Sequence, residues 1–425
     1  MKLFTLSLAV AGVLSVGGSA QQTAAAKPLQ IYVVDTEGGK ATLFVSPTGQ
    51  TALIDSGNPG ARDHDRIMAV LADAGVTKLD YLITTHYHVD HVGGLQELAK
   101  QVPIGTFVDH GPSVEEREQV PGFQAAYAEL YGKARHIVAK PGDKIPITGL
   151  DWRVVTSAGN ALKTPLPGAG KPNPTCSAFT PKDITTDPEN GQSLGSLITL
   201  GQFRAIDLGD LLWNKEGDLM CPNNPIGTID LYLVSHHGTD PSGSPQLVHA
   251  LQPRVAVMQN GTRKGAGTEA MPTMRSSPGL EDIWQLHWSF GAGIEQNSAG
   301  VFIANVEDAT TTAAALTAPP RGGGGGGGRG AAPAAGSPPA AGGTAPAIAS
   351  PPIVSPAIAA SPGGAAAGAP ASGTPGGQGG GRGAQPPPHT PAYWIKITAQ
   401  PDGSFTVSNS RNGYSKTYPA RPRAR

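Results

Sequence analysis

The chain has almost no net charge and only two cysteines. Its 425 residues include 31 Lys and Arg against 32 Asp and Glu, so the net charge is −1 at pH 7, and charged residues are only 15% of the total. This balance offers no basic surface for a polyanion, and strong nucleic-acid binding is not expected. The two cysteines, Cys176 and Cys221, match no zinc-binding spacing, which leaves a disulfide or two free thiols as alternatives.

Long hydrophobic runs are also scarce. The run LFTLSLAVAGVLSV near the start is too short to span a bilayer comfortably, and no other stretch is long enough for a transmembrane helix. Lys2 precedes this run, and the small residues Gly18 and Ala20 follow it, so residues 1–20 are predicted to be an export signal. Cleavage would leave a periplasmic or extracellular protein without a transmembrane segment.

Acidic residues are missing between Ala309 and Ala392, where the sequence is almost entirely Ala, Gly, Pro, Ser and Thr. Such a segment cannot bury enough apolar area to offset its ordering entropy, so residues 309–392 are predicted to be a disordered linker. Residues 393–425 alternate apolar and polar side chains between turn signals, which predicts a β-ribbon. So short a segment has no core of its own, and we expect it to dock on the main domain.

The globular part is predicted to comprise residues 27–308. Apolar, strand-like runs such as LQIYVVD, LDYLITT and LYLVSHH recur within it, and helical stretches such as DHDRIMAVLADAG lie between some of them. Strands and helices mixed in this way predict a layered α/β domain.

Histidine and aspartate are crowded in one short segment, TTHYHVDHVGG, which contains His86, His88, Asp90 and His91. Buried polar groups need partners, and groups packed this closely would have to share them. A metal ion is a partner that satisfies all four. His86 and His88 point the same way in an extended segment, whereas Asp90 and His91 enter a turn, so two neighbouring clusters are predicted.

Two more apolar runs end in possible ligands, one at Asp210 and the other at His236 and His237. If these runs are strands of one sheet, their ends meet at one edge, where open α/β sheets place their ligand sites. Asp210 can then bridge the two clusters. His236 directly ends its strand and is expected to reach a metal, whereas His237 would point to the opposite face, towards substrate or towards a residue that hydrogen-bonds to a metal ligand. Imidazole and carboxylate ligands suit Zn²⁺, and also Mn²⁺ or Fe²⁺.

The H-x-H-x-D-H motif resembles the signature of the metallo-β-lactamase superfamily. The opening IYVVDTEGGKATLFVSPTGQTALIDSGNPG and the later LGSLITL, LGDL and LVSHHGTD are similar, in this order, to the branch found in the ComEC/Rec2 competence proteins. The resemblance covers roughly residues 29–262. It implies an α/β fold, a four-layer αββα sandwich with metals at one edge of the sheets, here with a C-terminal β-ribbon and a disordered insertion.

The resemblance also assigns ligands. The first metal would be held by His86 and His88, the second by Asp90, His91 and His236, with Asp210 as the bridge. The usual third histidine of the first metal is missing, since no histidine lies between His136 and His236. Asn190 or Ser193 occupies that region, so one or two ions are expected.

These observations predict an exported metallo-hydrolase. A bound divalent ion lowers the pKa of its water to about 7, and the resulting hydroxide attacks a carbonyl or phosphoryl centre. Asp90 would orient the nucleophile, and His237 would protonate the leaving group or hold the oxyanion. The resemblance slightly favours a phosphodiester or nucleic-acid-type substrate. The alternatives are hydrolysis of an ester, lactone or lactam, and a non-catalytic metal-binding surface module. The oligomeric state is not predicted.

Overall fold

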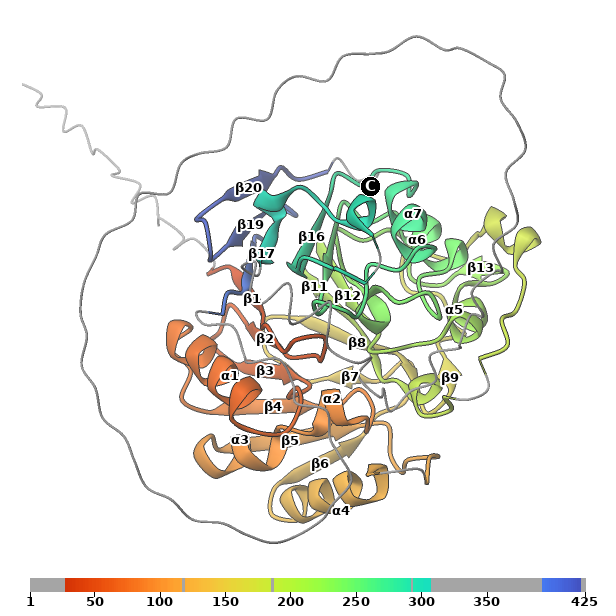
Figure 1. Cartoon of the computed structure of the whole chain (residues 1–425). Helices are drawn as coiled ribbons and strands as arrows, with labels where there is room; N and C mark the ends of the chain where they lie inside the picture. The colour runs from red at the N-terminus through yellow and green to blue at the C-terminus, as the bar shows by residue number, and fades with distance from the viewer. Residues whose placement is uncertain (1–26, 117–118, 185–186, 292, 307–391, 422–425) are drawn as a thin grey trace, which may run out of the picture. The chain divides into compact units, whose positions relative to one another are not determined.

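The computed structural model covers most of the predicted globular domain and the C-terminal ribbon (Figure 1). The residues that it describes are 27–116, 119–184, 187–291, 293–306 and 392–421. The predicted export signal, and the predicted linker apart from Ala392, lie outside the described residues. No helix in the described ranges combines the length and apolar character needed to cross a bilayer.

The first of two large sheets carries the C-terminal ribbon at one edge. In spatial order its strands are β20 (Ser415–Tyr418), β19 (Phe405–Asn409), β18 (Ile395–Ala399), β1 (Leu29–Val33), β2 (Thr42–Val45), β3 (Thr51–Ile54), β4 (Leu79–Ile83), β5 (Ile104–Asp109) and β6 (Arg135–Val138). β18 pairs antiparallel with β1, from Leu29 opposite Ala399 to Val33 opposite Ile395. The ribbon is therefore part of the sheet that contains the first described strand.

The second large sheet is built from the later part of the domain. Its strands, in spatial order, are β17 (Ile303–Asn305), β16 (Asp282–His287), β15 (Val255–Met258), β14 (Leu231–Leu233), β12 (Phe203–Asp207), β11 (Gly195–Leu200), β8 (Asp151–Ser157) and β7 (Lys144–Ile145), with β9 (Asn160–Ala161) paired to β8. A separate small sheet joins β10 (Lys171–Pro172) to β13 (Asn223–Asn224).

Helices line both large sheets (Figure 1). Beside the first sheet are α1 (Ala61–Asp73), α2 (Val89–Val92), α3 (Leu95–Gln101) and α4 (Val120–Tyr131). Beside the second are α5 (Trp213–Met220), α6 (Pro245–Leu251) and α7 (Ala270–Arg275). The 3-10 turns are η1 (Pro174–Ala178), η2 (Asn190–Gln192), η3 (Ser235–Gly238), η4 (Ile294–Gln296) and η5 (Gly300–Phe302).

Alternation along the strands separates three apolar cores. On β1, Ile31 packs into the core between the sheets, whereas its neighbour Tyr32 packs on the helix side. On β15, Val257 faces the core between the sheets and Met258 packs under the helices of the second sheet. Successive side chains of a strand point to opposite faces, so both sheets are buried on two sides. The predicted four-layer αββα sandwich with a C-terminal ribbon is confirmed.

A disulfide links Cys176 on η1 to Cys221, the residue after α5. Of the two alternatives that the sequence left open, the structure therefore contains the paired one. The bond ties the loop that follows β10 to the end of α5.

Candidate metal centre

The polar side chains of the site lie just after the ends of strands that run parallel to a neighbouring strand. β3 is parallel to β4 in the first sheet, and β12 is parallel to β14 in the second. Asp55 directly follows β3, and His86 lies shortly after β4. Asp210 follows β12, and His237 follows β14. Because the carboxyl ends of parallel strands lie at the same edge, these residues come together there.

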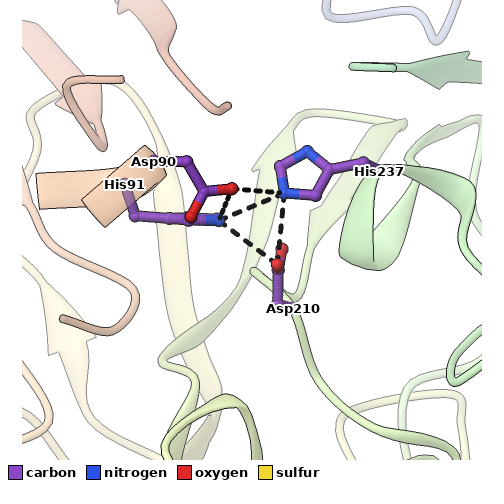
Figure 2. A group of neighbouring side chains, drawn as sticks. All are labelled: Asp90, His91, Asp210 and His237. Atoms are coloured by element: carbon purple, nitrogen blue, oxygen red, sulfur yellow. Dashed lines mark hydrogen bonds and ion pairs between the residues drawn. The ribbon is translucent and has the colours of Figure 1, made fainter. Parts of the chain in front are cut away.

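Four side chains, called here the four-residue cluster, converge at this edge: Asp90, His91, Asp210 and His237 (Figure 2). One ligand atom from each lies within 4.8 Å of all the others. His237 Nε2 is 3.1 Å from Asp210 Oδ2 and 3.4 Å from Asp90 Oδ2. His91 Nε2 is 3.3 Å from Asp210 Oδ2. Two imidazoles and two carboxylates thus surround one point, a donor set that suits a divalent ion.

Both carboxylates of the cluster are ionised. Burial alone raises the pKa of Asp210, but the neighbouring histidines outweigh it and hold this pKa well below its usual range. The pKa of Asp90 is likewise held low against burial by the nearby cations. Burial lowers the pKa of His91, yet the three carboxylates around it raise that pKa to about 10. Without a metal, His91 therefore keeps a second proton at neutral pH, which a metal must displace.

Hydrogen bonds on the outer side fix how the two imidazoles of the cluster face inwards. His91 Nδ1 donates to Asp55 Oδ2 over 2.8 Å. His237 Nδ1 donates to the backbone oxygen of Gln259 over 3.1 Å. In the neutral form, each ring then directs the Nε2 lone pair inwards, and these two nitrogens are only 3.2 Å apart. At this separation the two nitrogens share either the second proton of His91 or a metal ion that displaces it.

His86 and His88 form a second arrangement of the same kind, called here the paired histidines. His88 Nε2 lies 3.1 Å from Glu115 Oε2 and donates to it. Thr85 donates its hydroxyl hydrogen to Asp55 over 2.7 Å, so the Thr85 oxygen accepts from His86 Nδ1, which is 3.1 Å away. His86 Nε2 and His88 Nδ1 are left facing each other as acceptors, 3.0 Å apart. A cation bound by these two nitrogens would satisfy both acceptors.

Asp210 lies between these two arrangements. Its Oδ2 faces the four-residue cluster, whereas its Oδ1 is buried and receives a hydrogen bond from none of the described residues. A buried carboxylate oxygen without a donor costs free energy unless a cation binds it. The residue before Asp210 is Gly209, which has a φ of 58°. A Cβ at this position would lie only 2.8 Å from Thr85 Cβ, so the absence of a side chain lets the backbone approach Thr85 and carry Asp210 to the site. The bridging role expected for Asp210 stays a prediction.

The structure differs from the sequence-based expectation for the adjacent histidines. His237, which was expected to point away towards substrate, enters the four-residue cluster. His236, which was expected to complete the second metal site, has its Nε2 3.8 Å from Asp210 Oδ2 and outside the cluster. The expectation assumed an extended backbone. Instead both residues lie in the left-handed region, with φ at 50° and 57°, so the alternation of an extended strand does not apply.

Three residues near the site were missed by sequence reasoning. Glu115 and Asp187 both contact His88 Nε2, the latter at 3.3 Å. Lys264 Nζ lies 2.5 Å from Asp90 Oδ2, and its side chain is 37% exposed. All three lie outside helices and strands, so no periodicity marks them. Asp55 lies in the opening segment that resembles the family, but the sequence analysis assigns no role to it.

A separate buried group of Asp35, Glu37 and His287 has its own cation. Arg66 pairs with Asp35 at 2.9 Å and with Glu37 at 3.5 Å, and His287 Nε2 lies 2.5 Å from Asp35. The guanidinium already supplies the positive charge that a metal would bring. We therefore assign this group a structural role.

Comparison with known proteins finds one matching family and several distant relatives. The model of the metallo-beta-lactamase superfamily matches residues 35–178. ComE operon protein 3 of Bacillus subtilis is 29% identical over 196 residues, which is 46% of this chain and 22% of that protein. Competence protein ComA of Neisseria gonorrhoeae is 24% identical over 220 residues, 52% of this chain and 25% of that protein. The matched region spans about a quarter of these relatives.

A metallo-beta-lactamase from Cronobacter sakazakii is 16% identical to the chain and matches with a TM-score of 0.27. The match covers 44% of this chain and 64% of that one. The predicted resemblance to the superfamily and to its competence-protein branch is confirmed by the family and sequence matches.

Proposed function

Because the chain belongs to the metallo-beta-lactamase superfamily, as a hydrolase with a buried His/Asp cluster, we propose that it hydrolyses a phosphodiester or related anionic ester outside the cytoplasm. The observation that carries the proposal is the four-residue cluster, in which two imidazole nitrogens and two ionised carboxylates converge as a donor set that suits a divalent ion. Export rests on the predicted signal at residues 1–20.

The donor set fits Zn²⁺, Mn²⁺ or Fe²⁺, and Zn²⁺ is the ion that we propose. Asp90, His91, Asp210 and His237 would hold it. When bound, such an ion supplies a hydroxide at neutral pH and polarises the bond that is attacked. The protein itself orients the two imidazoles through outer hydrogen bonds, from His91 to Asp55 and from His237 to the backbone oxygen of Gln259.

Lys264 supports an anionic substrate. Its ammonium group lies against Asp90, the most exposed member of the four-residue cluster, and its own side chain is the more exposed of the two. The loop that carries it packs closely on η3, since a Cβ on the next residue, Gly265, would collide with the backbone oxygen of His237. A cation held at this position attracts a phosphate oxygen, and a neutral ester or lactam gains less from it.

The relatives add weaker support for a nucleic-acid-type substrate. One is named as a competence protein, but the chain covers only 25% of it. The net charge of −1 does not favour tight binding of a long polyanion. We therefore propose that the substrate is a short phosphodiester, or that the protein cleaves a longer strand one bond at a time.

The test is hydrolysis by the purified full chain, loaded with Zn²⁺ or Mn²⁺ and compared with an EDTA-treated sample. Bis-p-nitrophenyl phosphate, p-nitrophenyl acetate, a lactone and a lactam form the substrate panel. We expect metal-dependent release of p-nitrophenol from the phosphodiester, abolished in Asp210→Ala. A preference for the neutral substrates would instead support the alternative function, hydrolysis of an ester, lactone or lactam. A protein that binds metal and hydrolyses none of the panel would instead be a metal-binding surface module.

A further inference from the structure

We propose that Lys40 is a positioning residue of the site: its buried ion pair with Asp207 links the two large sheets and sets the distance between the two halves of the four-residue cluster. One half lies on α2, beside the first sheet, and the other half follows β12 and β14 of the second sheet. The inference rests on the proposed function, since it concerns the same site. It adds no ligand and no metal position.

The ion pair crosses from one sheet to the other inside the molecule. Lys40 lies in the loop between β1 and β2 of the first sheet, and Asp207 is the last residue of β12 in the second. Lys40 Nζ is 2.8 Å from Asp207 Oδ1, and the two side chains are only 2% and 1% exposed. Burial lowers the pKa of Lys40, but the carboxylate of Asp207 outweighs burial, and the pKa lies above its ordinary value. The ammonium group is therefore charged at neutral pH.

At the first sheet, the backbone of Lys40 holds the segment that carries Asp90. The backbone nitrogen of Lys40 donates to the backbone oxygen of Asp90 over 3.0 Å. The preceding residue, Gly39, packs on the same oxygen, since a Cβ there would lie only 2.6 Å from it. The backbone oxygen of Lys40 accepts from the nitrogen of Gly57 over 2.9 Å, which ties the loop to the turn after β3. A displacement of Lys40 would therefore displace Asp90.

At the second sheet, the carboxylate that receives Lys40 also fixes the turn that carries Asp210. Asp207 Oδ1 accepts from the backbone nitrogen of Gly209 over 2.9 Å, and Gly209 directly precedes Asp210. One oxygen atom thus contacts both the ammonium group and the turn. A continuous path of polar contacts runs from the backbone of Asp90, through Lys40 and Asp207, to the residue before Asp210.

The distance that this path sets is critical inside the four-residue cluster. His91 Nε2 in one half lies 3.3 Å from Asp210 Oδ2 in the other, and Asp90 Oδ2 lies 3.4 Å from His237 Nε2. Side chains that act together at a metal must be held within about 0.5 Å of their working positions. The four-residue cluster can meet this requirement only if the two sheets keep their spacing at this edge.

Stability of the fold alone does not account for a lysine and an aspartate at these two positions. A buried ion pair is often no more stabilising than apolar side chains of similar volume, because both charges lose their hydration. What the pair of Lys40 and Asp207 provides is a contact of fixed length and direction between two groups that also hold Asp90 and Asp210. The two roles can be separated by experiment.

The experiment compares two variants of the full chain with wild type. Lys40→Met leaves Asp207 buried without its cation. Lys40→Met combined with Asp207→Asn removes both charges, and the Asn oxygen can still accept from Gly209. Urea denaturation measures the stability of each fold, and competition with a chromophoric chelator measures the affinity for Zn²⁺. The visible absorption of Co²⁺-loaded protein depends on the number and arrangement of the ligands.

Lys40→Met should have a lower urea midpoint and should bind Zn²⁺ about 10- to 100-fold more weakly than wild type. The double variant should recover most of the midpoint, because no charge is left buried alone. It should still bind Zn²⁺ about tenfold more weakly, with an altered Co²⁺ spectrum. The matched control is Lys416→Met combined with Asp282→Asn. This pair also joins the two sheets, but at the amino end of β16, and the control should bind both ions as wild type does.

Recovery of both the midpoint and the metal binding in the double variant would overturn the inference, since the pair would then serve the fold alone. Wild-type affinity in Lys40→Met would overturn it too, and if that variant does not fold, the double variant decides. None of these measurements needs turnover. Weaker metal binding in the double variant, in a protein that hydrolyses none of the substrate panel, supports the role of Lys40 and removes the proposed function. A wild type that binds neither ion removes both.

Discussion

Asp55 accepts a hydrogen bond from His91 Nδ1 over 2.8 Å, and from both the backbone nitrogen and the hydroxyl of Thr85. One carboxylate thus orients an imidazole of the four-residue cluster and, through Thr85, the imidazole of His86. A residue outside the ligand set therefore supports both halves of the centre.

Replacing this carboxylate should weaken metal binding without removing a ligand. Asp55→Asn keeps the shape and suits the φ of 58° at this position, but it gives His91 a weaker acceptor. We expect the affinity for Zn²⁺ to fall by about 10- to 100-fold, as for other residues that orient metal-binding histidines. Competition with a chromophoric chelator measures it. Asp65→Asn, whose side chain is 72% exposed, is the control and should bind as wild type does.

Lys264→Ala should raise KM for an anionic substrate more than for a neutral one. Loss of a charged hydrogen bond to substrate corresponds to about tenfold or more in binding. Steady-state kinetics with bis-p-nitrophenyl phosphate and p-nitrophenyl acetate separate the two effects. Lys264→Arg should restore most of the anion preference, and Lys78→Ala, which removes an exposed pair with Asp80, should change neither KM. Equal effects on both substrates would contradict the role given to Lys264.

The stability of the fold should depend on the ionisation of Glu216. This buried residue of α5 accepts hydrogen bonds from the backbone nitrogens of Gly243 and Ser244, yet burial raises its pKa from an ordinary 4.5 to about 7. Between these values the folded protein binds more protons than the unfolded chain. Its contribution to the free energy of unfolding therefore falls as the pH rises through this window, by about 3 kcal/mol in all.

Urea unfolding on either side of that window tests the role of Glu216. Glu216→Gln stays uncharged at every pH, so its free energy of unfolding should fall less than that of wild type as the pH rises. Glu129→Gln, exposed on α4, should follow wild type. The same pH dependence in wild type and Glu216→Gln would show that this carboxyl ionises without cost.

The ribbon should contribute to stability through one face only. Phe405 and Thr406 are neighbours on β19, but Phe405 is buried between the sheets, stacked on Tyr418, and Thr406 is on the other face. Phe405→Ala should lower the free energy of unfolding by about 3–5 kcal/mol, because it removes a buried ring and leaves a cavity. Thr406→Ala should cost about 1 kcal/mol at most, since its bond to Thr417 is exposed. Urea denaturation of both variants gives the comparison, and equal losses would contradict the assignment of faces.

Local spacing was enough to predict much of the centre. The H-x-H-x-D-H motif places four candidate ligands in one segment, and Asp210 follows as a further candidate from the rule that strand ends meet at one edge. Glu115 and Lys264 could not be found in this way, because they lie in loops whose positions depend on tertiary contacts. The order of His236 and His237 was missed for a different reason. Side chains alternate between two faces only in extended backbone, and no local sequence pattern predicts a left-handed backbone at two successive histidines.

The pairing of β1 with β18 has a consequence for biosynthesis. Leu29 is among the first residues of the domain to be made, and its partner Ala399 among the last. Until the ribosome has passed this point, β1 presents an open edge, and the nascent chain cannot complete its first sheet. Contacts this distant in sequence slow folding and prolong the exposure of such an edge. We therefore expect a chain arrested before β18 is made to leave this edge open to chaperones and proteases.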